Sequence, residues 1–307
     1  MCGICGIYNY KEGNTGVTTE LVHRMMDAMT HRGPDDDGIH NDNFVSLGMR
    51  RLSIIDVATG KQPIYNERKD ICVVFNGEIY NYLPLMEDLK KKGHDFKTKS
   101  DTEVIVHLFE EFGTDSFSML NGMFAFALWD SKQQALFLVR DRFGIKPLNY
   151  ANVNGKLIFG SEIHLLLHDP DVSKEIDPLA LDTYLAYYYI NAPKTIFKSI
   201  RKVPSASFLE CKKGEISIKK YWQLTNTYLT GKGRDYYAEK IRELLSESVK
   251  LQLQSEVPLG VFLSGGLDST SIIALMRKHV SGAIKTFSIG FDDQSYSELP
   301  QAEKVAK

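Results

Sequence analysis

The sequence contains few cysteines, no long apolar run and almost no net charge. Four cysteines in 307 residues, at positions 2, 5, 72 and 211, are too few for a disulfide framework and favour a reducing compartment. The sequence has no run of about 18 apolar residues, so no membrane-spanning helix is expected. The N-terminus lacks the basic and apolar regions of a signal peptide. We therefore expect a cytoplasmic protein without a membrane partner.

The balance of charges also argues against nucleic acid as a partner. The chain has 37 lysines and arginines against 39 aspartates and glutamates, which leaves a net charge of -2. Cys2 and Cys5 have the spacing of a metal-binding pair, but no second pair or neighbouring histidine completes a site there. We expect no metal at this pair.

The length predicts about two domains, and the patterning changes once along the chain. We expect a first domain over 1–215, a Gly/Thr/Asn-rich linker over 216–233 and a second domain over 234–307. In the second domain the pattern predicts helix, strand, helix and strand over 236–254, 257–263, 268–279 and 284–289. This order is typical of a parallel, doubly wound α/β sheet. Because two strands make a poor parallel sheet, we expect the domain to continue beyond residue 307.

Strands dominate the first domain and helices are interspersed among them. We expect strands over 4–10, 45–52, 71–75, 123–130, 135–141 and 157–161, and helices over 20–29, 81–92, 103–112 and 177–189. The polar segment 31–38 is predicted to be a loop, and Asn76-Gly77 is predicted to end the strand before it. Ser100 and Glu103 have the spacing of a capping box at a helix start.

Cys2 is the strongest candidate for a nucleophile. Removal of Met1 would place this cysteine at the N-terminus, so that one residue carries both a thiol and a weakly basic α-amine. The small residues around it leave room for a ligand to approach the backbone. A buried structural cysteine at the start of a strand is the alternative.

Amide cleavage also needs an oxyanion site and groups that hold the substrate. The Asn76 side-chain amide and the Gly77 backbone N–H could stabilise an oxyanion, although Asn-Gly is equally a hairpin-turn pair. Arg51 could bind an α-carboxylate in a bidentate manner, and Asp101 or Glu78 could bind an α-ammonium group. Arg51 and Asp101, taken singly, are also compatible with surface ion pairs or helix caps.

A glycine-rich loop at 260–269 follows a predicted strand and opens a predicted helix. Glycines allow backbone to approach an anion, which the free N–H groups of the helix start can bind. The loop lacks the Lys-Ser/Thr pair of a Walker motif, so it does not predict a standard kinase or ATPase.

Several motifs occur in order and together closely resemble the glutamine-hydrolysing asparagine synthetases. They are Cys2, His31-Arg32-Gly33-Pro34-Asp35, Arg51-Leu52-Ser53-Ile54-Ile55-Asp56, Asn76-Gly77-Glu78-Ile79-Tyr80-Asn81, Ser100-Asp101-Thr102-Glu103, Gly122-Met123-Phe124-Ala125-Phe126-Ala127 and Arg140-Asp141-Arg142-Phe143-Gly144-Ile145-Lys146-Pro147-Leu148. The first domain resembles a class II, N-terminal-nucleophile glutamine amidotransferase. The resemblance implies an αββα four-layer sandwich, followed by the start of an α/β synthetase domain.

The resemblance also implies roles for individual residues. Cys2 would be the nucleophile, Asn76 and Gly77 would form the oxyanion hole, and the loop 32–35 would line or cover the pocket. Glutamine would be held by Arg51, Leu52, Ser53, Ile54, Ile55, Asn76, Gly77, Glu78 and Asp101.

The loop in the second domain resembles that of ATP-pyrophosphatases. This implies an ATP and pyrophosphate site at Leu263, Ser264, Gly265, Gly266, Asp268, Ser269 and Ile289, with Asp268 as a candidate Mg²⁺ ligand. Cys5, Cys72 and Cys211 are expected in the core.

The implied activity is glutamine-dependent synthesis of asparagine from aspartate and ATP, with release of AMP and pyrophosphate. Three alternatives stay open: an amidotransferase for another carboxylate, a β-lactam-synthetase-like enzyme, and a glutamine-binding module or glutaminase without a working synthetase half. The relatives of β-lactam synthetase lack the N-terminal cysteine that this chain has. The sequence does not decide whether the protein is a homodimer.

Overall fold

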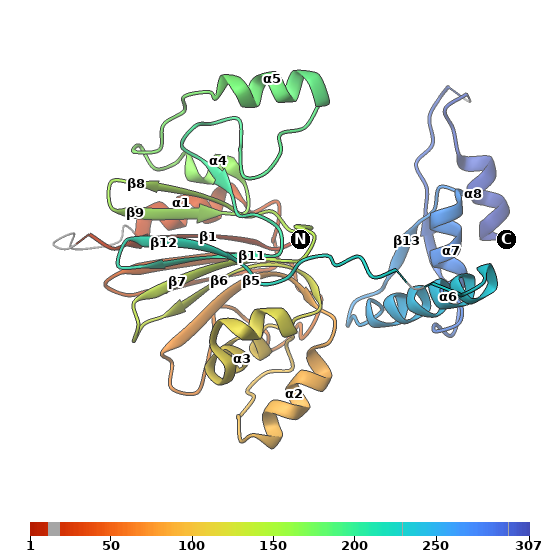
Figure 1. Cartoon of the computed structure of the whole chain (residues 1–307), viewed down its shortest axis with the longest axis horizontal. Coiled ribbons are helices and arrows are strands. Elements are labelled where there is room, and N and C mark those ends of the chain that lie inside the picture. The colour runs from red at the N-terminus through yellow and green to blue at the C-terminus, as the bar shows by residue number, and fades with distance from the viewer. Residues whose placement is uncertain (12–18, 229, 294) are drawn as a thin grey trace. The chain divides into compact units, whose positions relative to one another are not determined.

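The computed structural model describes residues 1–11, 19–228, 230–293 and 295–307, which form two compact units, Met1–Leu224 and Thr225–Lys307. The first unit contains two six-stranded antiparallel sheets (Figure 1). The strands of the first sheet are β1 (Gly3–Asn9), β2 (Asp36–Asn41), β3 (Val45–Arg51), β8 (Asn149–Val153), β9 (Lys156–Gly160) and β10 (Arg201–Lys202). Their spatial order is β10-β8-β9-β1-β3-β2.

The second sheet lies against the first through a shared apolar core. Its strands are β4 (Ile64–Tyr65), β5 (Ile71–Ile79), β6 (Gly122–Asp130), β7 (Ala135–Arg140), β11 (Ser207–Lys212) and β12 (Glu215–Lys220). Their spatial order is β12-β11-β7-β6-β5-β4. The most buried strands are β1, β3 and β9 in the first sheet and β5, β6 and β7 in the second.

Helices cover the outer face of each sheet. The first sheet is covered by α1 (Thr19–Ala28) and α4 (Ile163–Leu166), and the second by α2 (Tyr82–Lys91), α3 (Glu103–Phe112) and the short helix η1 (Gly113–Met119). Helix α5 (Pro178–Tyr187) follows α4 in the chain. The layers are helix, sheet, sheet and helix, which confirms the αββα sandwich (Figure 1).

Strand β6 shows how the sequence separates the layers. Phe124, Phe126 and Leu128 point to the helical layer, whereas Ala125 and Ala127 point to the other sheet. Successive side chains on a strand face opposite sides, so the alternation of large and small residues supplies both interfaces. The alanines leave room between the sheets, where Cys72 and Cys211 are buried; Cys5 is buried under α1.

The prediction that Asn76-Gly77 ends its strand is wrong. Strand β5 continues to Ile79, and Asn76 and Gly77 pair with Ala125 and Phe124 of β6. A Cβ at Gly77 would lie 2.1 Å from the carbonyl oxygen of Met123. The glycine is therefore needed for close approach of the neighbouring strand and not for a turn.

Two other local predictions also differ from the structure. Asp36 to Gly38, placed in a loop by their polarity, begin β2 because they pair with β3 at the sheet edge. The capping box does not form: the Glu103 carboxylate accepts the backbone N–H groups of Lys97 and Thr98, at 2.9 and 2.7 Å. Glu103 thus fixes the loop before α3.

The linker predicted over 216–233 begins too early. Residues 216–220 lie in β12, which pairs with β11 along its whole length. The second unit contains α6 (Arg234–Leu251), β13 (Gly260–Phe262), α7 (Leu267–Met276), β14 (Lys285–Phe287) and α8 (Leu299–Ala306). β13 and β14 pair in parallel, as the strand–helix–strand pattern predicted.

None of the helices in the part of the chain that the structure describes is long and apolar enough to cross a membrane.

Candidate active site

A cavity of about 280 Å³ opens beside the N-terminus of the first unit. It is of the size expected for a small-molecule site. Its lining comes from the starts and ends of strands in both sheets and from the loop before α3. The lining residues are Met1, Cys2, Arg51, Leu52, Ile54, Ile55, Gln62, Phe75, Asn76, Gly77, Glu78, Ser100, Asp101, Thr102, Met123 and Lys146.

Cys2 lies at the entrance to β1, with its sulfur against the end of β3. The backbone N–H of Leu52 points to the Cys2 Sγ at 3.3 Å. The carbonyl of Cys2 accepts a hydrogen bond of 2.9 Å from Arg32 Nε, and Arg32 is itself paired with Glu162 at 2.8 Å. The nucleophile candidate is thus held on both sides by groups distant in sequence.

Burial raises the pKa of the Cys2 thiol, although the hydrogen bond from Leu52 acts in the opposite direction. The thiol is therefore mostly protonated at neutral pH in this form of the chain, and the reactive thiolate has to be generated by a base. Burial also raises the pKa of the Cys5 thiol, which lies in the core away from the cavity.

Asn76 is an unpaired donor at the wall of this cavity. The residue is 1% exposed, and its Nδ2 has no hydrogen-bond partner among the described residues. Buried polar groups without a partner are uncommon in folded proteins. Gly77 lines the same wall. The Asn76 side-chain amide and the Gly77 backbone therefore border the cavity that Cys2 also lines.

The segment after β3 is folded around Arg51. Its Nη2 donates to the carbonyl oxygens of Ile55 and Asp56, at 3.0 and 2.8 Å, while the side chain lines the cavity. Ser53 does not line the cavity; its backbone N–H donates to Asp35 at 2.9 Å. Residues 32–35, predicted to line or cover the pocket, are not among its lining residues. Arg32 and Asp35 instead hold the backbone of Cys2 and Ser53.

Asp101 is a buried carboxyl group in the floor of the cavity. Its Oδ2 accepts the backbone N–H of Ile79 at 2.9 Å, and the hydroxyls of Ser100 and Thr102 lie 3.4 Å from Oδ1. Burial, with a smaller contribution from the neighbouring Glu78, raises the pKa of Asp101 to about 6. Burial likewise raises the pKa of Glu78, although Lys146 opposes this. Because a bound cation would stabilise their charged forms, both carboxyl groups are suited to bind one.

An Asp101→Asn variant should lose affinity for an ammonium-bearing ligand and gain stability. A charge-assisted contact contributes about 1.5–3 kcal/mol, so the glutamine KM should rise by roughly 10- to 150-fold. Because burial disfavours the charged form, Asp101 lowers the free energy of unfolding as the pH rises from its unfolded pKa toward 6. The variant should match wild type in thermal unfolding at pH 4 and melt higher at pH 7.

The same group predicts a pH dependence of binding. In wild type the glutamine KM should rise as the pH falls below about 6, because a protonated Asp101 cannot pair with an ammonium group. Steady-state kinetics against pH would measure this, with the exposed Asp88→Asn as the matched control. An unchanged KM in Asp101→Asn would remove this residue from the ligand site.

Several lining residues were not predicted from the sequence. Gln62 accepts the Phe75 N–H at 2.7 Å and points its amide nitrogen toward Thr102 at 3.4 Å. Lys146 is buried, and its ammonium group donates to the Met1 sulfur at 3.4 Å. Lys146 belongs to the motif Arg140–Leu148, but its contact with Met1 joins residues 145 positions apart, which the motif does not predict.

The glycine-rich loop of the second unit joins β13 to α7. Gly265 has a φ of +80°, and a Cβ there would lie 2.6 Å from the Gln301 backbone. Ser264 Oγ accepts the Gly266 N–H at 3.2 Å and lies 3.1 Å from Ser269 Oγ. Asp268 is exposed in the first turn of α7. Glycine is thus required for the turn that places this helix start.

A second cavity, of about 450 Å³, lies at the carboxyl ends of β13 and β14 within this unit. Of the residues predicted to bind ATP, Leu263, Ser264 and Ile289 line this cavity, whereas Gly265, Gly266, Asp268 and Ser269 are not among its lining residues. Phe262, Phe287, Ser288, Phe291 and Glu298 complete the lining and were not predicted. Ligands of open α/β sheets bind at such strand ends.

The layered fold with a cysteine at its N-terminal strand defines the N-terminal-nucleophile class of amidotransferase. Among solved structures, the chain is similar in fold to the glutamine phosphoribosylpyrophosphate amidotransferase from B. subtilis complexed with ADP and GMP. The TM-score is 0.53 at 17% identity, over 95% of this chain and 67% of that one. A structure described as the allosteric regulatory enzyme of purine biosynthesis gives a TM-score of 0.55 at 16% identity, over 95% and 66% of the two chains.

Residues 1–222 match the family model of the glutamine amidotransferase domain, and residues 240–307 match that of asparagine synthase. The chain belongs to the glutamine amidotransferase domain family. It is 39% identical to asparagine synthetase [glutamine-hydrolyzing] 1 of Bacillus subtilis, over 100% of this chain and 48% of that protein. It is 33% identical to asparagine synthetase B [glutamine-hydrolyzing] of Escherichia coli, over 100% and 49%. The chain thus spans about half the length of these relatives.

Proposed function

We propose that the first unit hydrolyses glutamine to glutamate and ammonia at Cys2. The observation that carries this proposal is the convergence of Cys2, the unpaired Asn76 amide and the buried Asp101 on one small cavity. The Cys2 thiolate would attack the side-chain amide carbon of glutamine, and Asn76 Nδ2 and Gly77 N–H would stabilise the oxyanion. The amide nitrogen would leave as ammonia after taking up a proton, and water would then release glutamate from the thioester.

The remaining residues of the cavity would bind the amino-acid end of glutamine. Arg51 offers a guanidinium for the α-carboxylate. Asp101 and Glu78 offer carboxylates for the α-ammonium group, and their raised pKa values would fall once that charge is bound. Leu52, Ile54 and Ile55, which line the same cavity, would contact glutamine between these groups and Cys2. Ser53, which does not line the cavity, would hold this segment in place through its hydrogen bond to Asp35. Release of ammonia and glutamate from glutamine, without ATP, tests this half of the proposal.

For the whole protein we propose glutamine-dependent asparagine synthesis, in a reducing, cytoplasmic setting. Ammonia from the first site would amidate aspartate that ATP has activated as aspartyl-adenylate, with AMP and pyrophosphate as products. Support comes from the asparagine synthase match over 240–307 and from relatives named as glutamine-hydrolysing asparagine synthetases. ATP–pyrophosphate exchange across a set of carboxylic acids, measured on the complete protein, would separate aspartate from other acceptors.

The glycine-rich loop would hold the pyrophosphate end of ATP. Ser264, Gly265, Gly266 and Ser269 form a turn that a side chain at Gly265 would obstruct, which fits a phosphate cradle. Leu263 and Ile289 would contact the nucleotide from the second cavity. Asp268 would hold Mg²⁺, since carboxylates together with phosphates are its usual ligands, and the ion would neutralise phosphate charge.

In the complete protein, Asp268→Asn should lower aspartate-dependent pyrophosphate release by at least about tenfold, because a metal ligand is lost. Glutamine hydrolysis should stay within twofold of wild type, roughly the experimental error of such a measurement. Pyrophosphate release and glutaminase activity would be measured on the same preparations, with Asp235→Asn on α6 as the control. Normal pyrophosphate release in Asp268→Asn would contradict the metal role.

A further inference from the structure

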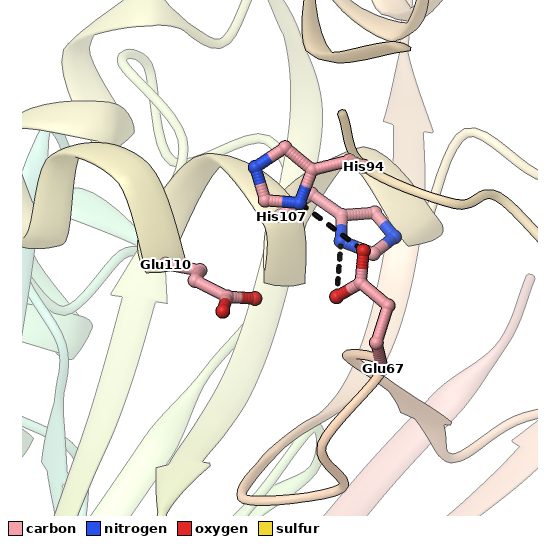
Figure 2. A group of neighbouring side chains, drawn as sticks. All are labelled: Glu67, His94, His107 and Glu110. Carbon is pink, nitrogen blue, oxygen red and sulfur yellow. Dashed lines mark hydrogen bonds and ion pairs between the residues drawn. The ribbon is translucent and has the colours of Figure 1, made fainter. Parts of the chain in front are cut away.

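A second group of ionisable side chains lies outside the cavity, between the β4–β5 connection and α3. Glu67 comes from that connection, His94 from the loop between α2 and α3, and His107 and Glu110 from α3 itself. One ligand atom from each of the four lies within 4.8 Å of all the others (Figure 2). Three segments distant in sequence therefore bring two imidazoles and two carboxylates together.

The two imidazoles flank a single carboxylate. Nδ1 of His94 is 3.3 Å from Glu67 Oε1, and Nδ1 of His107 is 3.4 Å from Glu67 Oε2 (Figure 2). Zinc binds nitrogen and oxygen ligands at about 2.0–2.2 Å in tetrahedral geometry. Ligands at those bond lengths in a tetrahedron are about 3.3–3.6 Å apart, so these separations, which also suit direct ion pairs, fit the ligands of one ion.

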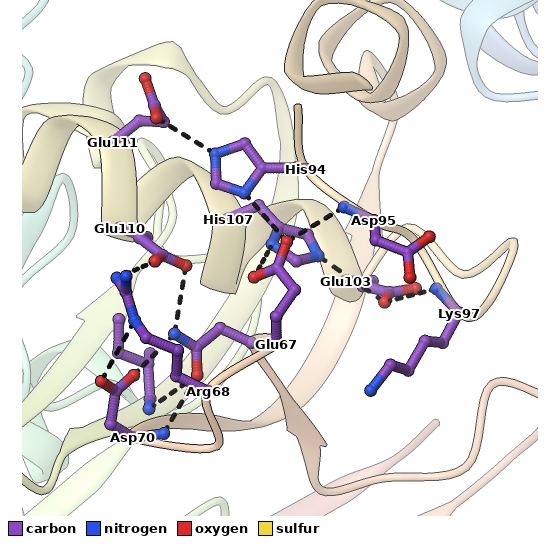
Figure 3. A network of polar contacts seen from close by, with 12 residues as sticks. Glu67, Arg68, Asp70, His94, Asp95, Lys97, Glu103, His107, Glu110 and Glu111 are labelled. Atoms are coloured by element: carbon purple, nitrogen blue, oxygen red, sulfur yellow. Dashed lines mark hydrogen bonds and ion pairs between the residues drawn. The ribbon is translucent and has the colours of Figure 1, made fainter. Parts of the chain in front are cut away.

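The opposite nitrogen of each ring faces another carboxylate. Nε2 of His94 is 3.2 Å from Glu111 Oε1, and Nε2 of His107 is 3.6 Å from Glu103 Oε1 (Figure 3). Metal-ligating histidines commonly direct their second nitrogen at a carboxylate, which orients the ring and raises its basicity. Both histidines of this cluster show that arrangement.

His107 is the fully buried member of the cluster, and its ring nitrogens reach carboxylates only at ion-pair distances of 3.4 and 3.6 Å. The residue is 0% exposed, and neither of its ring nitrogens makes a hydrogen bond with any residue that the structure describes. A buried imidazole whose nitrogens lack hydrogen bonds is costly. A cation between Nδ1 and the Glu67 carboxylate would replace this long contact of 3.4 Å with two short metal–ligand bonds.

The two carboxylates of the cluster, Glu67 and Glu110, differ in how freely they could bind a metal ion. Oε1 of Glu67 also accepts the backbone N–H of Asp95 at 3.0 Å, which fixes the position of this carboxylate. Glu110 is held by Asn66 and Arg68, so it contributes nearby negative charge and not a free ligand.

We propose that Glu67, His94 and His107 bind one divalent transition-metal ion of the zinc type, with water at the fourth position. Imidazole and carboxylate together suit Zn²⁺ and exclude a calcium-type site, which needs six or more oxygens. The ion would tie the β4–β5 connection to α3. Because Glu103 also fixes Lys97 and Thr98, the tie would stabilise the loop that leads to Asp101.

Metal binding to the chain tests this proposal directly. Chelator-treated protein carrying Cys2→Ala, which removes the reactive thiol as a ligand, is titrated with CoCl₂ and with ZnCl₂ at neutral pH. We expect one equivalent of Co²⁺ to give the visible bands of a four-coordinate nitrogen and oxygen site. Zinc at a hundredfold excess over its Kd should raise the Tm by about 5–10 °C.

Three histidine variants in the same background distinguish a built site from random binding. His94→Gln and His107→Gln should each weaken metal binding by about 100-fold or more, since loss of outer contacts alone costs about 10- to 100-fold. The exposed His23→Gln on α1 should bind as the parent does. If His107→Gln fails to fold without metal, His94→Gln decides the question. Absence of the cobalt bands, or an equal zinc response in His94→Gln and its parent, would overturn the proposal.

Discussion

Replacement of Cys2 by alanine is expected to abolish glutamine hydrolysis. The sulfur is the group in the cavity that can form the thioester, and loss of a catalytic nucleophile costs about 10⁴-fold or more in rate. The fold should be retained, because Cys2 lies at the cavity edge and its Sγ hydrogen-bonds to the Leu52 backbone, at 3.3 and 3.5 Å, and to no other described residue. Ammonia-dependent synthesis in the complete protein should persist, since the proposed adenylation loop belongs to another unit.

Glutamate release and thermal unfolding would be measured on the same samples. Cys5→Ala is the matched control: Cys5 is three residues away, buried in the core and shielded from the cavity. We expect it to keep its activity with a modest loss of stability. Glutaminase activity of Cys2→Ala within tenfold of wild type would show that another residue carries the nucleophile.

Removal of Met1 is expected to switch the glutaminase on. While Met1 is attached, the nitrogen of Cys2 is a peptide amide and cannot accept the thiol proton. Met1 also lines the cavity, and its sulfur accepts the Lys146 ammonium group at 3.4 Å. A molecule that retains Met1 should therefore be slower by about 10²- to 10⁴-fold, the usual contribution of a general base.

This prediction can be checked with two preparations of one sequence. A cleavable tag placed directly before Cys2 yields a chain that begins with cysteine, and intact-mass spectrometry verifies both forms before assay. Equal thermal unfolding would show that the difference in activity is chemical and not structural. Full activity in a preparation whose mass includes Met1 would remove the N-terminal amine from the mechanism and require a separate base.

The regular elements could be predicted from local patterns, because each obeys a short period. The strands predicted over 123–130 and 135–141 match β6 and β7 to within one residue, and α1 and α3 follow from apolar residues at helical spacing. The parallel pairing of β13 with β14 followed from the strand–helix–strand order. The four-layer fold itself came from the resemblance of ordered motifs and not from periodicity.

The site was predicted where its residues stand in motifs. Cys2, Arg51, Asn76, Gly77, Glu78 and Asp101 all line one cavity, although Ser53 does not. Gln62 and Lys146 were missed because nothing local distinguishes them: each reaches the cavity only after the two sheets have stacked. Their contribution depends on contacts between segments far apart in the chain.

Local chemistry was misleading where a neighbouring strand or helix overrides it. Asn76-Gly77 has the composition of a turn, but pairing with β6 keeps it in a strand, and the glycine is explained by the Met123 carbonyl against it. Ser100 and Glu103 have the spacing of a capping box, but the loop at Lys97 offers Glu103 better donors.

The cluster of Glu67, His94 and His107 shows the same division between sequence and tertiary structure. Its members lie on three segments and have no recognised metal-binding spacing, so the amino-acid sequence does not reveal the cluster. Sequence alone determined which segments are strands and helices and which residues carry reactive groups. Only the packed structure decided which groups meet, because spatial proximity arises from long-range packing whereas periodicity is a property of neighbours.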